Sequence, residues 1–488
     1  MSKLGLYIHI PFCESKCSYC DFVSFCGQEK RMEEYVEALI GEMRLYSGKF
    51  AGKEFDTVYI GGGTPSVLPA HAVEKIVTAV RENFVFSCHS EADLQHRQQN
   101  VIASECVAIS RKRTIKKEVP FQGILTSPCQ APQDDINSEN NPTRIDARKD
   151  TNNNDIEITI EVNPRSLTEE KLNEYLRVGV NRISLGVQCM NDAVLKTIGR
   201  VQTVADVEKA FALLKRHGVE NISADLMLGL PNETYADIDN TLNFFATHGV
   251  KHISAYGLQI ESGTPLARQI ETGVISVPDE DETTNQYEHA CARMRELGFI
   301  RYEISNFAKV ETNKELNCSL PRDPHGDKSP QDDITKCHCE EQFCVTWQSR
   351  GSEPYVWISK HNSKYWDGTE YLGLGVSASG YFNNMRYTNT KNLDEYINKI
   401  SEGKLPIDYI ETLSKEQRRE ERIMLTLRTE HGLELDKFTS EFGENLLETK
   451  KEEIEKLLKA GLIEIKGNVI RINDDKVYIS NSIITELI

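Results

Sequence analysis

Three cysteines near the start of the chain have a spacing that suits an iron–sulfur cluster. Cys13, Cys17 and Cys20 follow one another as C-x-x-x-C-x-x-C. Three thiolates can hold three corners of a [4Fe–4S] cube, which leaves the fourth iron free to bind a small molecule. A structural zinc site would need a fourth ligand, usually from a second cysteine pair, and only Cys26 lies close by. The spacing therefore favours an open cluster over a zinc loop or a disulfide loop.

A second group of residues could bind the molecule at the free iron. Gly62, Gly63 and Thr64 belong to a Gly-Gly-Gly-Thr-Pro turn, and glycines let a ligand approach the backbone closely. Carboxylate, amide and guanidinium side chains then follow at the ends of later predicted strands. They are Glu161, Gln188, Arg200 and Asp225. Each could instead satisfy its own loop, but four at successive strand ends favour a polar binding site.

Short apolar segments alternate with amphipathic ones through the first two thirds of the chain. Segments rich in Val, Ile and Tyr predict strands at residues 4–10, 56–60, 156–162, 182–187, 221–228 and 252–258. Helical spacing of apolar residues predicts helices at residues 32–46, 70–83, 166–178, 204–217 and 235–248. For the third helix, a capping box from Ser166 to Glu169 and a C-terminal cap at Gly179 are expected.

This alternation predicts an α/β fold with a parallel sheet, closed into a partial or complete (β/α) barrel. Chemistry in such a barrel lies at the C-terminal ends of the strands. Cys13 directly follows the first predicted strand, as that rule expects.

The composition limits the classes of partner and compartment. The chain has 488 residues, 39% of them hydrophobic, and a formal net charge of −18. This charge argues against nucleic acid or an anionic membrane as a partner. No apolar run approaches the roughly 20 residues that span a bilayer, although peripheral membrane contact is possible. With no signal-peptide pattern and thirteen scattered cysteines, we expect a cytoplasmic protein.

Two polar stretches interrupt the alternating pattern. We expect a barrel core over residues 1–308 with an insertion at about 86–155, and a second insertion at 309–357. The second holds Cys318, Cys337, Cys339 and Cys344. Three of these, Cys337, Cys339 and Cys344, could ligate a metal, but incidental thiols in an insertion are the favoured interpretation.

The chain is expected to end in a small separate domain. Residues 358–400 should complete the barrel, and residues 401–488 should form a C-terminal α+β domain. Predicted helices at 416–430 and 450–460 precede a hairpin made of residues 463–465 and 469–472. Helices followed by a hairpin are typical of a winged-helix-like module, for which the acidic chain favours a packing or lid role over DNA binding.

Several motifs together resemble the HemN/HemW family of radical S-adenosylmethionine (SAM) proteins. They are residues 7–13 with the two later cysteines, and residues 61–66, 161–164, 184–188, 225–231 and 301–308. The resemblance runs nearly end to end outside the insertions. It implies a radical-SAM barrel, a [4Fe–4S] cluster, bound SAM and a C-terminal domain that closes over the site. It also adds Tyr7 and Tyr19 to the expected SAM pocket.

Two differences within this family favour its heme-chaperone branch. The coproporphyrinogen oxidases carry a further cysteine where this chain has Phe22, and they have a longer N-terminal arm. The chain also has a His-Asn-x-x-Tyr motif at His361, and imidazole is a common axial ligand of heme iron. Relatives often have a cysteine just before this histidine and another histidine downstream, where this chain has Ser359 and Ser379.

The resemblance implies a heme chaperone that binds a cluster, SAM and heme and delivers heme to acceptor proteins, with an electron donor as a further partner. The alternative is an oxygen-independent coproporphyrinogen III oxidase of porphyrin biosynthesis. A radical SAM enzyme with an unrelated substrate is the third possibility, because a fold does not fix a substrate.

Overall fold

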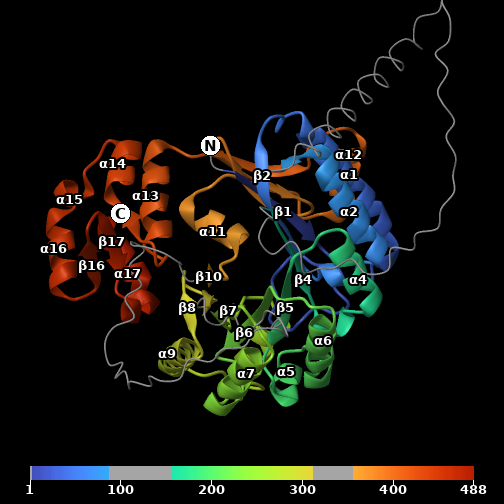
Figure 1. The fold of residues 1–488 in the computed structure, drawn as a ribbon, viewed down its shortest axis with the longest axis horizontal. Helices are drawn as coiled ribbons and strands as arrows, with labels where there is room; N and C mark the ends of the chain where they lie inside the picture. Colours follow the sequence, from blue (N-terminus) through green and yellow to red (C-terminus); the bar gives the residue numbers. More distant parts are fainter. Residues whose placement is uncertain (1–2, 87–155, 312–354) are drawn as a thin grey trace, which may run out of the picture. The chain divides into compact units, whose positions relative to one another are not determined.

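The computed structural model describes residues 3–86, 156–311 and 355–488 and contains a large twisted sheet with helices along its outer face (Figure 1). The parallel strands lie in the order of the chain. They are β1 (Leu4–Ile10), β2 (Glu54–Gly62), β4 (Glu157–Val162), β5 (Arg182–Gln188), β6 (Ile222–Leu228) and β7 (His252–Gly257). All six predicted strands are therefore confirmed. Leu6 and Ile8 in β1 are fully buried, as expected for a strand covered on both faces.

The connecting helices carry the crossovers between the parallel strands. They are α1 (Met32–Ser47), α2 (Ala70–Asn83), α4 (Glu169–Arg177), α5 (Asp192–Thr197), α6 (Val204–Arg216) and α7 (Tyr235–Thr247), while α8 (Pro265–Glu271) and α9 (Glu280–Glu296) follow β7. The five predicted helices are among them. Gly179, after α4, has a φ of +90°, which confirms the predicted left-handed cap.

The start of α4 differs from the prediction. Thr168, not Ser166, is the N-cap residue, and its side chain accepts a hydrogen bond from the Lys171 N–H at 3.2 Å. The Ser166 hydroxyl lies 2.6 Å from the Ser66 hydroxyl instead, within a short 3₁₀ turn that follows β4. The capping box predicted from Ser166 is therefore wrong, because that hydroxyl has a tertiary partner.

The sheet is a partial barrel, because its two edges continue into antiparallel strands and do not pair with each other. One edge adds β8 (Phe299–Arg301), β9 (Asn306–Glu311) and β10 (Tyr355–Val356) beside β7; the short β3 (Val85–Phe86) lies off the main order. At the other edge, β11 (Tyr371–Leu374) pairs with β1 and leads to β12 (Ser379–Phe382), β13 (Met385–Asn389) and β14 (Ile407–Thr412). The predicted limit at residue 308 thus falls inside β9, while the other domain limits stay predictions.

A buried carboxylate joins the outer helices to the second edge. Glu42 of α1 is fully buried and accepts hydrogen bonds from the Gly375 N–H, the Asn389 amide and the Tyr396 hydroxyl at 2.7–2.8 Å. Tyr396 belongs to α12 (Leu393–Ser401). Burial raises the pKa of Glu42 to about 7, against the hydrogen bonds that favour its charged form.

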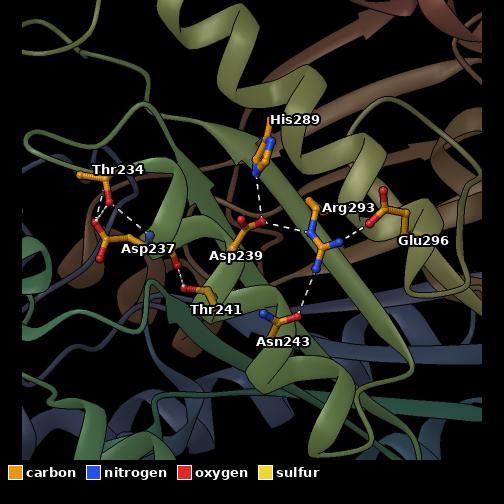
Figure 2. A network of polar contacts seen from close by, with 8 residues as sticks. All are labelled: Thr234, Asp237, Asp239, Thr241, Asn243, His289, Arg293 and Glu296. Atoms are coloured by element: carbon orange, nitrogen blue, oxygen red, sulfur yellow. Dashed lines mark hydrogen bonds and ion pairs between the residues drawn. The ribbon is translucent and has the colours of Figure 1, made fainter.

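Polar contacts on the outer face hold α9 against α7 (Figure 2). Asp239 of α7 accepts from His289 at 2.9 Å and from Arg293 at 3.1 Å, both on α9. Arg293 also donates to the Asn243 side-chain oxygen of α7 at 3.3 Å.

Within the described ranges, no helix is long and apolar enough to cross a membrane.

The C-terminal domain has its own core. It comprises α13 (Lys415–Thr426), β15 (Leu433–Glu434), α14 (Leu435–Phe442), α15 (Leu446–Thr449), α16 (Lys451–Lys459), β16 (Ile463–Lys466), β17 (Val469–Ile472) and α17 (Ser480–Leu487). The side chains of Phe438, Leu446 and Ile470 are almost fully buried in this core. The hairpin of β16 and β17 follows the helices, which confirms the predicted winged-helix-like arrangement.

Candidate functional site

The cysteine loop, residues 13–20, begins three positions after the last residue of β1 and is held by backbone hydrogen bonds at two points. The Cys13 N–H donates to the Phe25 carbonyl at 3.1 Å, and the Ser18 N–H donates to the Ile198 carbonyl at 3.1 Å. Cys13, Cys17 and Cys20 are all free and partly exposed. The loop therefore presents its three thiols at the C-terminal edge of the parallel sheet, which is where barrel chemistry is found.

Two polar groups of the protein contact the thiols directly. The Cys13 sulfur lies 3.3 Å from the Thr64 hydroxyl, and the Arg200 guanidinium donates to the Cys17 sulfur at 3.6 Å. Burial raises the pKa of Cys20, and a bound cation would favour its deprotonation. A cluster supplies such charge, because its irons bind thiolates.

The three sulfurs are not gathered as the ligands of one ion. Within residues 3–86, 156–311 and 355–488, no three His, Cys, Asp or Glu side chains are grouped to hold a single metal. The sulfurs of a cubane site bind three different irons and need not be grouped around a single ion. Cys26 is exposed and follows Phe25, outside the loop of three.

The glycine turn after β2 packs directly against the cysteine loop. Gly62 has a φ of +114°, a conformation that other residues rarely adopt. A Cβ at Gly63 would come within 2.8 Å of the Phe12 carbonyl and 3.1 Å of the Cys13 sulfur. Only glycine therefore allows the second strand end to approach the loop this closely.

Glu161 ties the glycine turn to the next strand. It accepts hydrogen bonds from the Tyr59 hydroxyl at 2.8 Å and from the Gly62 N–H at 3.0 Å. Burial raises the pKa of Glu161, although both hydrogen bonds favour the carboxylate. The structure thus brings Glu161 of β4 into contact with the turn that holds Gly62 and Gly63, beside Cys13.

Gln188 and Arg200 form the opposite wall of the site. Gln188 ends β5 at a register shift against β6 and has a φ of +68°, which is strained for a residue other than glycine. Its side-chain oxygen accepts from the Arg200 guanidinium, which also donates to the Gly186 carbonyl at 2.5 Å. Such strain is typical of functional positions.

Asp225 and Arg200 keep binding capacity that the protein does not use. The Arg200 Nε is buried without a partner, and no described residue makes a hydrogen bond to the Asp225 carboxylate. Burial, and then the nearby Glu161, raise the pKa of Asp225 to about 7, against Arg200 and Arg182. A cation, an acceptor and open backbone groups fit a nucleoside that carries an amino-acid tail, as SAM does.

The two predicted tyrosines lie on different sides of this site. Tyr19 belongs to the cysteine loop and packs on a buried cluster that includes Leu195 and Met227. Tyr7 points into the barrel, where its hydroxyl lies 3.0 Å from His9 and its ring stacks on Tyr59. Burial raises the pKa of both Tyr7 and Tyr19.

His361 lies at the other end of the strands, in α11 (Lys360–Asp367), a helix beside β2 and apart from the outer helices (Figure 1). Its side chain is almost fully buried. Its two ring nitrogens lie 2.8 Å from the Thr57 hydroxyl and 2.9 Å from the Tyr365 hydroxyl. Burial, with Lys364 and Arg182, lowers the pKa of His361 to about 3. The His361 ring stacks on Tyr59, which binds Glu161, and His361 lines one cavity with Tyr7. Among the described residues, no hydrogen bond or ring contact joins His361 to the three cysteines or to the other predicted SAM residues.

Two residues at the site were missed in the sequence. Tyr59 holds Glu161, and Arg182 lowers the pKa of Glu161 and Asp225 from within the barrel. The two-residue alternation of β5 could have found Arg182, since it shares a face with Ser184 opposite the apolar Ile183. The cysteines of the second insertion, Cys318, Cys337, Cys339 and Cys344, lie outside the described residues.

Comparisons with known proteins agree with this arrangement. The model of the radical SAM superfamily matches residues 131–245, and the model of the HemN C-terminal domain matches residues 413–475. The chain contains a radical SAM domain and a HemN-type C-terminal domain. The first of these ranges does not include the cysteine motif, so the assignment of the three thiols rests on their spacing and position.

Full-length relatives extend this resemblance. The heme chaperone HemW of Lactococcus lactis is 28% identical over 477 residues, covering 98% of this chain and 95% of that protein. The heme chaperone HemW of Bacillus subtilis is 27% identical and covers 98% and 97%. These matches confirm that the chain resembles the HemW type of this family.

A solved structure supports the fold. The coproporphyrinogen III oxidase HemN from Escherichia coli, described as a radical SAM enzyme, superposes with a TM-score of 0.67. The two sequences are 18% identical, and the match covers 99% of this chain and 90% of that one. At this identity the likeness shows the fold alone.

Proposed function

We propose that this protein binds a [4Fe–4S] cluster through Cys13, Cys17 and Cys20, binds SAM beside the cluster, and carries heme to acceptor proteins. The observation that carries the cofactor assignment is Arg200, which contacts the Cys17 sulfur and the Gln188 side chain at once. This contact joins the cysteine loop to the polar groups of the expected SAM pocket. The named function of the full-length relatives supports heme as the cargo.

Each residue at the strand ends has a defined task in this proposal. A cluster with bound SAM supplies one-electron chemistry. Arg200 offers its unpaired Nε to an anionic group, and Asp225 offers an acceptor to ligand hydroxyls. Gly62 and Gly63 keep side chains away from the backbone beside Cys13, and Thr64 orients the Cys13 sulfur. An electron donor is needed only if SAM is cleaved.

His361 is our candidate heme ligand. The low pKa keeps the imidazole neutral near pH 7, and the neutral ring is the form that binds a metal. Iron ligation requires that the ring gives up its hydrogen bond to Tyr365 or to Thr57. Heme binding at His361 therefore requires a change in the position of α11 or of the His361 side chain.

Anaerobic reconstitution followed by a hemin titration tests the proposal. We expect iron-dependent visible absorbance, a Soret shift on hemin addition, and transfer of heme to apomyoglobin as a model acceptor. His361→Ala should weaken the Soret shift, whereas His289→Ala, an ion-paired surface histidine on α9 (Figure 2), should leave it unchanged. A wild-type protein that takes up no hemin contradicts the chaperone assignment.

The same preparation decides between the chaperone and the oxidase. Anaerobic turnover of coproporphyrinogen III to protoporphyrinogen IX would establish the oxidase, for which the HemN structure offers support at the level of fold only. We expect no such turnover. We also expect a reducing compartment such as the cytoplasm, because an open cluster is sensitive to oxidation.

A further inference from the structure

A cavity of about 220 Å³ lies inside the partial barrel, between α11 and the concave face of the sheet. Side chains of five strands and of α11 line it, among them Tyr7, Arg182, Ser184, Ser254 and His361. We call it the Arg182 cavity. Its volume is below the range of about 300–1,000 Å³ typical of sites that enclose a whole drug-sized ligand. It can therefore hold part of a larger molecule or a small one.

Arg182 is a buried cation without a partner. Its exposed fraction is 2%. No residue in the described part of the chain makes a hydrogen bond or an ion pair with its guanidinium. A guanidinium carries five N–H donors, and an unpaired charge in a protein interior is costly. A protein rarely keeps such a group unless a ligand completes it.

The carboxylates nearest to Arg182 are held by other groups. Glu161 accepts from Tyr59 and Gly62, and both oxygens of Glu157 accept backbone N–H groups at the start of α11. Asp225 acts on Arg182 through space only, since no ion pair joins them. Long-range attraction lowers the energy of the charge but does not supply acceptors for its N–H groups.

Neighbouring hydroxyls add to the unused donors. Ser184 and Ser254 line the Arg182 cavity, and neither side chain has a hydrogen-bond partner among the described residues. The Thr159 hydroxyl, at the register position beside Arg182 on β4, is also buried without a partner. In contrast, the imidazoles of His252 and His361 in the same wall have partners on both nitrogens.

We propose that the Arg182 cavity binds a carboxylate group, which Arg182 grips as a bidentate partner while Ser184 and Ser254 donate to the same anion. A cation beside unpartnered hydroxyls, with no ion pair to a carboxylate of the described residues, selects an anion, and a planar carboxylate matches the guanidinium fork. Under the function proposed above, on which this identification rests, the carboxylate belongs to a propionate side chain of the tetrapyrrole. The small volume suits one such arm and not the macrocycle.

A test on the ligand-free protein separates the cavity from the heme function. The thermal unfolding midpoint is measured with sodium propionate and with the neutral isostere propionamide, at equal ionic strength. We expect propionate, but not propionamide, to raise the wild-type midpoint by about 2 °C at concentrations well above its Kd. Arg182→Met should abolish the difference, and Arg182→Lys should keep part of it, since it keeps the charge without the fork. Arg293→Met, which removes a paired surface arginine (Figure 2), is the matched control and should keep the full difference.

A second measurement addresses the source of the carboxylate. Wild-type protein should bind hemin about tenfold more tightly than hemin dimethyl ester, and Arg182→Met should bring this ratio close to one without changing the affinity for the ester. If propionate and propionamide act alike on the wild type, Arg182 is a structural cation and the inference is wrong. If propionate alone is selected while hemin does not bind, the cavity stands and the proposed heme function fails.

Discussion

The two ends of the parallel strands differ in whether named buried polar groups have hydrogen-bond partners. At the C-terminal ends, Arg200 has a buried Nε without a partner and Asp225 accepts no hydrogen bond from any described residue. At the N-terminal ends, both nitrogens of His361 and both oxygens of Glu157 are bonded. Buried polar groups normally have partners, so the unpartnered groups at the first end, which we call the open end, mark a ligand site. At the second end, which we call the closed end, the groups that hold α11 are satisfied, and unpartnered groups are found in the adjacent Arg182 cavity.

Backbone conformation follows the same division. Gly62 and Gln188 adopt positive φ at the C-terminal ends of β2 and β5, and strain of this kind persists where the surrounding structure enforces it. α11, at the other end, begins with an ordinary N-cap at Ser359, reinforced by Glu157. The contrast can be tested from both sides, beginning with the change of largest effect.

Replacing Cys13, Cys17 and Cys20 together by alanine should abolish the cluster. Because no other described cysteine belongs to the loop, reconstituted triple mutant should show only background iron and no visible absorbance. Circular dichroism should match the wild type, since the loop is held by backbone bonds from Cys13 and Ser18. Undiminished absorbance in the triple mutant would refute the assignment of this end of the barrel.

The closed end should make the ligand-free protein sensitive to acid. Burial lowers the pKa of His361 from 6.5 to about 3, so the unfolded chain binds a proton that the folded protein rejects. Stability is then full above pH 6.5 and falls as the pH drops towards 3. A tenfold change in proton affinity corresponds to about 1.4 kcal/mol, so the total loss is about 5 kcal/mol.

His361→Gln should flatten this part of the stability profile, which urea unfolding between pH 4 and 7 measures. Glutamine keeps a donor and an acceptor for Thr57 and Tyr365 but does not titrate. The exposed, ion-paired His71→Gln serves as the control and should keep the wild-type slope. An unchanged slope in His361→Gln would mean that the ring is not held neutral.

The open end should respond to pH in the opposite sense. Burial and Glu161 raise the pKa of Asp225 from 3.8 to about 7, so the folded protein holds this proton more tightly than the unfolded chain. The contribution is full below pH 3.8 and is lost as the pH rises through 7, by about 4 kcal/mol. Asp225→Asn should remove this loss and make the ligand-free protein more stable at pH 8. A mutant less stable than the wild type at pH 8 would show that Asp225 has a structural partner.

The sequence predicted the open end better than the closed one, for a physical reason. Cysteine spacing and a glycine turn depend on local chain geometry, so Cys13 and Gly63 could be placed without a structure. His361 was found by resemblance, but its burial depends on Thr57, which is 304 positions away. No local pattern reports such a contact. Likewise, the helix-like signal at Ser166 was misinterpreted, because its hydroxyl serves Ser66 across the fold.

The sheet edges show the same limit. The parallel strands from β1 to β7 alternate with helices and could be predicted. β11 instead joins the sheet by a long-range contact, because it runs parallel to β1 although its residue Tyr371 is 366 positions after its partner Gly5. The buried Arg182 could have been noticed from strand alternation, but its lack of a partner is a property of the folded interior.

The smallest expected effect concerns how α11 is held at the closed end. Glu157→Ala removes the acceptor for the N–H groups of Lys360 and His361, at 3.1 and 3.0 Å, and leaves the His361 N–H buried without a partner. Lost caps and unpaired buried donors each cost about 1–2 kcal/mol, so the free energy of unfolding should fall by about 2 kcal/mol. Glu169→Ala in the first turn of α4, which is exposed, should cost less than about 0.5 kcal/mol. If the two variants are equally stable, Glu157 does not fix α11. The closed end could then open for a ligand without the free-energy cost of breaking the Glu157 hydrogen bonds.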